Sequence, residues 1–94
     1  MYGIIVQVAV DERREADANR ILHQMVVPQA RTRAGFVAGY WLRAIDGNVL
    51  RAVQIFDSKD SAEAAAHHIR SEGPPPGAPV TLQSVDVYEV LAQA

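Results

Sequence analysis

The chain has 94 residues, with nine basic and eleven acidic side chains spread along it and a formal net charge of −2. Hydrophobic residues make up 49% of it, which excludes intrinsic disorder and indicates one domain, residues 1–94, near the lower size limit for a self-sufficient core. The absence of cysteine excludes a disulfide framework and thiolate chemistry. Without a polybasic segment, a nucleic-acid partner is not expected.

The N-terminal segment YGIIVQVAV, Tyr2–Val10, has the alternation of a β-strand. Its even-numbered residues form a fully apolar face, whereas Gln7 interrupts the other face. The apolar run is too short to span a bilayer and no basic segment precedes it, so we expect neither a signal peptide nor a membrane helix. A cytoplasmic location is the default expectation.

A helix is predicted next, over residues 12–31. Asp11 is a plausible N-cap, and apolar residues then recur at helical spacing. Pro28 lies inside this pattern, where it removes an N–H and clashes with the preceding turn. We therefore expect a kink there, or a break followed by a short helical turn, and an end at Gly35.

Residues 36–57 are predicted to form a β-hairpin, because Asp46-Gly47-Asn48 separates two β-rich runs. The turn is centred either on Asp46-Gly47 or on Gly47-Asn48.

Strict alternation along the first of these strands separates its aromatic residues. It places Phe36 and Tyr40 on one face, and Trp41 with Val37 and Arg43 on the other. At most one of Tyr40 and Trp41 therefore enters any given pocket.

A second helix is predicted in SKDSAEAAAHHIR, with Ser58 or Asp57 as its N-cap and small residues on one face. The segment SEGPPPGAP is expected to be a stiff extended connector, because its prolines lack donors and fix φ. The last strand is predicted over Val80–Leu91.

The element order strand, helix, strand, strand, helix, strand is that of the ferredoxin-like α+β fold, a four-stranded antiparallel sheet with both helices on one face. The other face stays uncovered within one chain. We expect it to contain Ile5, Gln7, Ala9, Leu50, Ala52, Gln54 and Phe56, with alternate residues of the other strands. Because such a face is too apolar for water, a homodimer is predicted.

Two segments, VVPQARTRAGFVAGYWLR and VQIFDSKDSAEAAAHH, resemble the dimeric α/β-barrel superfamily, most closely its antibiotic-biosynthesis-monooxygenase type. The first is similar to that family's helix end followed by Gly-Phe at the start of strand two. The second is similar to its third strand running into a short helix. The resemblance covers essentially the whole chain, and it implies a homodimer whose last strand reaches across to the partner, with a pocket between helices and sheet.

The resemblance also implies a chemistry, since cofactor-free members of the family oxidise phenolic or quinol-like substrates with molecular oxygen in a dry pocket. No cofactor is expected on that basis. The candidate pocket residues are Gln7, Tyr40, Trp41, Gln54, Phe56 and His67. The alternative is a non-catalytic, homodimeric ligand-binding or stress-related protein whose own side chains fill the pocket.

Haem binding or degradation is a further alternative, because haem-degrading relatives use an asparagine in strand one, a tryptophan ending strand three and a histidine on the second helix. The corresponding places hold Gln7, Phe56, and His67 or His68. Both histidines project away from the apolar centre of their helix and are expected to be solvated. Gln7 and Gln54 either bond across the sheet or dimer core, or line a cavity.

Overall fold

The computed structural model describes residues 1–94. Its strands are β1 (Tyr2–Val10), β2 (Phe36–Arg43), β3 (Val49–Phe56) and β4 (Val80–Glu89). Its helices are α1 (Glu15–Ile21), α2 (Val27–Arg31) and α3 (Lys59–Glu72). A 3-10 turn, η1 (Glu12–Arg14), precedes α1, and a π-helical turn, η2 (Leu22–Val26), joins α1 to α2. No helix has both the length and the apolar character needed to cross a membrane.

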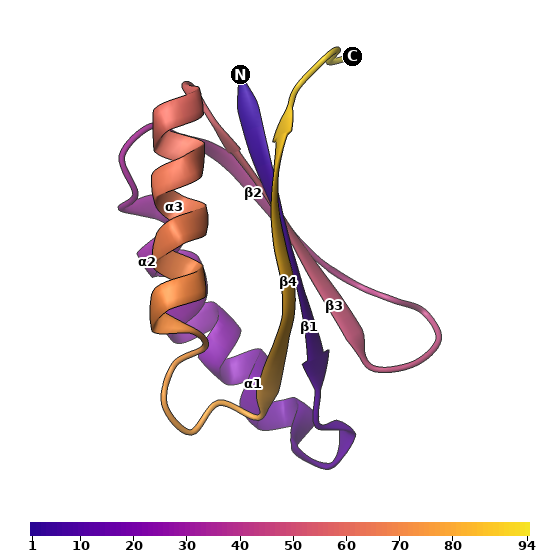
Figure 1. Cartoon of the computed structure of the whole chain (residues 1–94). Coiled ribbons are helices and arrows are strands. Elements are labelled where there is room, and N and C mark those ends of the chain that lie inside the picture. Colours follow the sequence, from indigo (N-terminus) through magenta and orange to yellow (C-terminus); the bar gives the residue numbers. More distant parts are fainter.

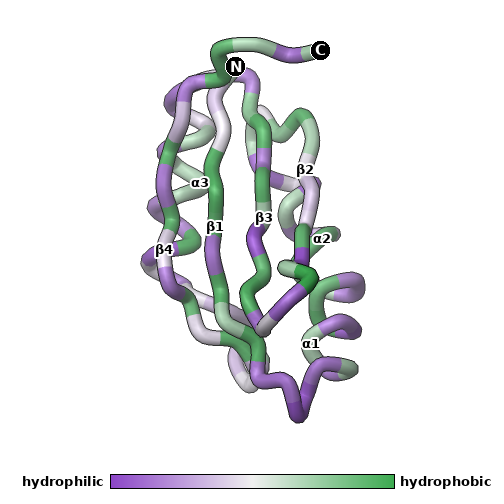
Figure 2. Tube along the Cα trace, turned by 90° about the vertical axis from the view of Figure 1, so that its right-hand side faces the viewer, coloured by the Kyte–Doolittle hydropathy of each residue, from purple (hydrophilic) through white to green (hydrophobic).

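The four strands form one sheet in the order β2-β3-β1-β4, in which every neighbouring pair is antiparallel. All helices lie on one face of this sheet, which leaves the opposite face bare (Figure 1). Figure 2 looks onto that bare face, with the helices behind the strands. We call it the outer face. The predicted ferredoxin-like α+β fold is therefore confirmed.

The core lies between α3 and the centre of the sheet. Ile4 of β1 and Phe56 of β3 are completely buried, each contributing roughly 1.5–3 kcal/mol from its buried area. Opposite them, α3 presents Ala62, Ala65 and Ala66, whose small side chains let the helix lie close to the strands. The helix begins at its Ser58 cap, where the Ser61 N–H donates to Oγ of Ser58 at 3.2 Å.

The predicted long helix is continuous, but its pitch changes. Asp11 caps its start, accepting from the backbone N–H of Arg13 at 3.1 Å. Pro28 lies in the first turn of α2, directly after the wider π-helical turn η2. Pro28 has no N–H to donate to the carbonyl four residues back, and the wider π-helical turn before it accommodates the proline within the continuous helix. The expected break therefore takes the form of a π-helical turn.

The predicted membership of the outer face is wrong for β3. Directly opposite residues of antiparallel strands share a face, and Ile4 faces Gln54 while Val6 faces Ala52. Because Ile4 and Val6 lie on the helix side of the sheet, so do Leu50, Ala52, Gln54 and Phe56. The outer face instead carries Arg51, Val53 and Ile55 of β3 beside Ile5, Gln7 and Ala9 of β1.

The predicted partition of the β2 aromatics also needs correction. Phe36 pairs with Phe56, but Ala38 pairs with Ile55, so Val37 is an extra residue in a β-bulge. The bulge reverses the alternation, and Phe36 therefore lies on the helix side with Trp41. Its ring packs edge-on against Phe56, with centroids 5.9 Å apart. Tyr40 is left on the outer face, 63% exposed.

The hairpin between β2 and β3 is present, but its loop is longer than a two-residue turn. It spans residues 44–48, and Gly47 is its only residue with positive φ. A type I′ turn needs positive φ at both central residues. Neither predicted two-residue turn of that type therefore forms.

Candidate functional site

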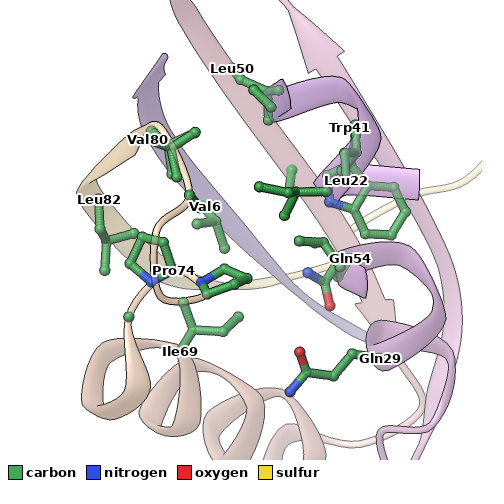
Figure 3. A pocket seen from close by; sticks show the side chains of 18 of the residues that line it. Val6, Leu22, Gln29, Trp41, Leu50, Gln54, Ile69, Pro74, Val80 and Leu82 are labelled. Atoms are coloured by element: carbon green, nitrogen blue, oxygen red, sulfur yellow. The ribbon is translucent and has the colours of Figure 1, made fainter. Parts of the chain in front are cut away.

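An apolar cavity of about 140 Å³ lies between the helices and the sheet (Figure 3). We call it the central cavity. Apolar side chains from every layer line it: Val6, Val8, Ala18, Ile21, Leu22, Val26, Leu50, Ala52, Ile69, Val80 and Leu82. Pro74 and Pro75 of the connector after α3 close one side. The polyproline segment predicted as a stiff connector thus forms part of the wall.

The cavity exists because the two helical arms, α3 and the continuous segment from η1 to α2, cover different parts of the sheet. α3 packs mainly on β4 and β1, whereas α2 contacts β2 at the other edge of the sheet. Figure 1 shows the two arms diverging on the same face of the sheet. Between them, the small side chain of Ala52 and the buried amide of Gln54 do not fill the space over β3.

Trp41 forms the wall of the central cavity on the β2 side. Its ring lies over Gly39, where an added Cβ would stand 2.9 Å from Cη2 of the indole and 3.1 Å from Cζ of Phe36. The absence of a side chain at Gly39 therefore lets the indole lie flat along the strand. The broad apolar surface of this ring is suited to stacking against another ring.

Gln54 is the buried polar residue of the site, with 2% of its surface exposed. Its Oε1 accepts a hydrogen bond of 3.1 Å from Nη1 of Arg33. Since a guanidinium only donates, this contact fixes which end of the amide is oxygen. The amide nitrogen has no hydrogen-bond partner in the chain, yet no buried polar atom is left unsatisfied, so this nitrogen is reached from the cavity. Figure 3 shows it on the cavity side.

Arg33 brings the only charged side chain to the central cavity. It follows α2, where its N–H donates to the carbonyl of Ala30 and its own carbonyl accepts from the N–H of Phe36. Gly35 makes the corner beyond it, with φ 74° and no room for a Cβ beside Asp57 and Ser61. Burial lowers the pKa of the Arg33 guanidinium below its ordinary value, because desolvation disfavours its charged form.

A second hollow adjoins the central cavity beyond Trp41, toward the end of β2. We call it the strand-end hollow; Trp41, Leu22 and Leu50 line both spaces. At its rim Arg43 forms a two-point ion pair with Glu15, which ties β2 to α1. His23 also lines it, and its Nδ1 lies 2.9 Å from the carbonyl oxygen of Asn19.

The residues predicted for the pocket divide between the two faces of the sheet. Trp41 and Gln54 line the central cavity. Gln7 and Tyr40 lie on the outer face, where Gln7 donates to Gln83 at 2.8 Å and accepts from Arg51 at 3.1 Å. Phe56 is enclosed in the core without lining the cavity.

His67 is exposed on α3 and outside the central cavity, in keeping with the expected solvated helix face. His68 is exposed too, but it lines a third hollow that shares Gln29 and Arg33 with the central cavity. No group of three or more potential metal-ligating side chains occurs in the structure.

Sequence reasoning misses two polar residues that line the cavity, Gln29 and Arg33. Gln29 belongs to α2. Arg33 lies in a turn between a helix and a strand, where neither the helical nor the strand period applies. The one usable signal is its position two residues before Gly35, at the corner that the family resemblance already identifies.

No protein-family model matches the chain, and no curated protein matches it in sequence. Solved structures do match its fold. The haem-degrading protein MhuD from Mycobacterium tuberculosis, solved with two haems in its active site, aligns with a TM-score of 0.73 at 19% identity, covering 100% of this chain and 99% of MhuD.

Two further structures, both described as monooxygenases, match the fold. The ActVA-Orf6 monooxygenase of Streptomyces coelicolor, solved with nanaomycin D, has a TM-score of 0.61 and 14% identity over 99% of this chain and 89% of that one. A protein from Chloroflexus aurantiacus described as an antibiotic biosynthesis monooxygenase has a TM-score of 0.61 and 17% identity, covering 99% of this chain and 96% of that one. The resemblance predicted from sequence is thereby confirmed at the level of the fold.

Proposed function

We propose that this chain, which has the fold of the antibiotic-biosynthesis-monooxygenase type of dimeric α/β barrel, binds a small aromatic molecule in the central cavity and promotes its oxidation by dioxygen. The observation that carries the proposal is the cavity itself, an apolar space walled by Trp41 with the polar groups of Gln54 and Arg33 at one side. Few well-placed polar groups in an otherwise apolar concavity are typical of small-molecule sites.

The size of the cavity favours a single ring. Its volume of about 140 Å³ is close to the void of about 150 Å³ that holds benzene in an engineered protein cavity. The indole of Trp41 can stack on such a ring from one side.

The lining side chains restrict the chemistry. None of them is an Asp, Glu, His, Cys, Ser, Lys or Tyr, so the cavity contains neither a nucleophile nor an ordinary general base. The reaction must therefore draw on the substrate's own electrons. For a phenol, the O–O bond of one dioxygen breaks: one oxygen atom forms a new C=O opposite the hydroxyl, and the other leaves as water with the hydroxyl proton and the displaced ring hydrogen. The four electrons that reduce dioxygen come from the ring, so no external electron donor is needed. The protein's contribution is to bind the ring, orient it and exclude bulk water.

Oxygen uptake tests this proposal. We expect the protein to accelerate dioxygen consumption and quinone formation with phenol and with methoxyphenols whose para position is free. Trp41→Leu should reduce the rate about tenfold or more, because a loss of roughly 1.4 kcal/mol of ring contact corresponds to tenfold. Tyr40→Leu is the matched control, since Tyr40 lies on the outer face, and it should leave the rate unchanged.

A non-catalytic ligand-binding protein is the second candidate, and the absence of any acid or base in the cavity favours it. The same experiment separates the two candidates. Saturable phenol binding without oxygen uptake would assign the cavity to ligand binding alone. If the protein shows no phenol binding and no oxygen uptake, both candidate functions are contradicted.

Haem is the ligand of the MhuD structure, but the central cavity does not fit it. Haem iron is held by His, Cys, Met or Tyr side chains, and none of these lines the cavity. Its volume is also that of one small ring. His68 lines only the neighbouring hollow, and His67 lines none of the three hollows. We therefore derive no chemistry through haem.

We further propose that two copies associate through the outer face. The exposed apolar residues Tyr40, Leu42 and Tyr88 lie on it, together with half-buried Ile5, Val53 and Ile55. Figure 2 shows hydrophobic segments along several of these strands, with no helix in front of them. The same face carries the polar side chains of Gln7 and Arg51, which hydrogen-bond to each other. Exposed apolar residues interspersed with a few polar ones are typical of a subunit interface.

A further inference from the structure

We propose that Arg33 and Gln54 form an anion-binding subsite of the central cavity, and that the ring bound there carries a carboxylate. This inference rests on the proposed binding of an aromatic molecule and specifies its chemical class. It comes from the placement of one arginine and one buried amide beside an apolar space.

The first observation is that Arg33 lacks a counter-ion. The ion pairs of the structure, defined by N···O distances up to 4.0 Å, involve Arg13, Arg14, Arg20, Arg43 and Lys59. Arg33 takes part in none of them, although it is partly buried and those arginines are more exposed. Its one side-chain contact is to the neutral amide oxygen of Gln54. A charge withdrawn from water without an opposite charge is costly, and a bound anion would offset that cost.

The second observation is the direction of the Gln54 amide. Arg33 occupies its oxygen, so its NH₂ group faces the cavity as a donor without a partner in the protein. The two residues together therefore offer N–H donors side by side, from the remaining guanidinium nitrogens and from the amide. An acceptor with two oxygens in one plane satisfies such donors better than a single hydroxyl does.

The third observation is the extent of the apolar space beside this pair. Trp41, Leu22 and Val6 line the cavity together with Gln54 and Arg33, so a ring and its carboxylate would occupy one continuous site. Figure 3 shows the side chains of Gln54, Trp41 and Leu22 grouped around the same space. A carboxylate attached directly to a single aromatic ring matches this arrangement in size and polarity.

Benzoate and benzamide provide the test, because they have nearly the same shape and differ in charge. Their dissociation constants are measured through the fluorescence of Trp41, the only tryptophan of the chain. We expect benzoate to bind at least about tenfold more tightly than benzamide, since hydrogen bonds to a charged group are the stronger ones. Equal affinities would overturn the anion subsite while leaving an aromatic cavity. Binding of neither probe would contradict the aromatic cavity as well.

Two variants assign the preference to Arg33. Arg33→Met should abolish the benzoate preference and leave benzamide binding within about twofold. Arg31→Met is the matched control: Arg31 ends α2, is exposed, and forms no ion pair, so this variant removes the same charge without touching the cavity. A benzoate preference that survives in Arg33→Met would overturn the inference.

Gln54→Glu keeps the inference testable if Arg33→Met is poorly folded. The new carboxylate has the shape of the amide and pairs with Arg33 inside the protein, so the fold should be retained. It should also repel benzoate and reduce its affinity about tenfold or more, while benzamide continues to bind. Unchanged benzoate affinity in a folded Gln54→Glu protein would contradict the proposed subsite.

Discussion

The orientation of Trp41 depends on a neighbour that has no side chain. Gly39 does not require an unusual backbone angle, since its φ is not positive; the requirement is space beneath the indole. Without that space the ring could not lie along β2, and the wall it provides to the central cavity would be lost.

We therefore expect Gly39→Ala to displace the indole, because its Cβ would stand 2.9 Å from the ring. The fluorescence emission of Trp41 should shift to the red as the ring moves toward water, and phenol binding should weaken severalfold. Gly3→Ala is the control: its Cβ would approach the flexible tip of Ile55 on the outer face at 3.2 Å. An unchanged emission spectrum in Gly39→Ala would contradict the proposed role of the glycine.

At the scale of single residues, the sequence identifies two of the four polar or aromatic side chains that line the cavity. Trp41 and Gln54 belong to predicted strands and are among the predicted pocket residues, whereas Gln29 and Arg33 are not. The sequence does not distinguish Gln7, which lies outside the cavity, from Gln54, which lines it. Both are glutamines among apolar neighbours, and only the pairing of Ile4 with Gln54 shows that they point to opposite faces.

At the scale of elements, α3 fits the sheet because its inner face is made of alanines. Ala62 is completely buried against the core. We expect Ala62→Leu to destabilise the fold by about 1–3 kcal/mol, since three extra carbons must force α3 away from the strands. Ala64→Leu, on the exposed side of the same helix, should change stability by no more than about 0.5 kcal/mol.

Equilibrium denaturation in urea measures this difference. Equal stabilities of Ala62→Leu and Ala64→Leu would show that α3 does not pack as closely as the burial of Ala62 indicates. A shift in the unfolding midpoint without a change of slope would assign the effect to the folded state.

The order of elements follows from the sequence, but which residues of each strand face the helices does not. The bounds of β1 are predicted correctly, and of the two predicted caps of α3, Ser58 and Asp57, the structure has Ser58; alternation and capping residues are local signals. The bulge at Val37 and the register between β1 and β3 depend on long-range pairing, so alternation within one strand cannot reveal them. The π-helical turn before Pro28 likewise could not be predicted, because it does not change the spacing of apolar residues in a recognisable way.

At the scale of the whole molecule, the bare sheet face accounts for the proposed homodimer. Val53 lies near its centre, opposite Ile5 on one side and Tyr40 on the other. We expect the wild-type chain to sediment as a dimer at micromolar concentration and Val53→Arg as a folded monomer, because a buried unpaired charge would oppose association. Ala16→Arg, exposed on α1, adds the same charge and should remain dimeric.

A wild-type monomer in that experiment would remove the dimer proposal. It would leave the central cavity untouched, because every residue that lines the cavity comes from one chain and from the helix side of the sheet.

Binding of an aromatic ring against Trp41, in the space between the helices and the sheet, underlies both the proposed oxidation and the anion subsite. Its most direct test is a ¹H–¹⁵N NMR titration with phenol, following the single indole N–H and the side-chain amides. We predict saturable shifts of the Trp41 indole and the Gln54 amide, while the Gln7 and Gln83 amides on the outer face stay in place. Unmoved Trp41 and Gln54 signals, or shifts confined to Gln7 and Gln83, would contradict it.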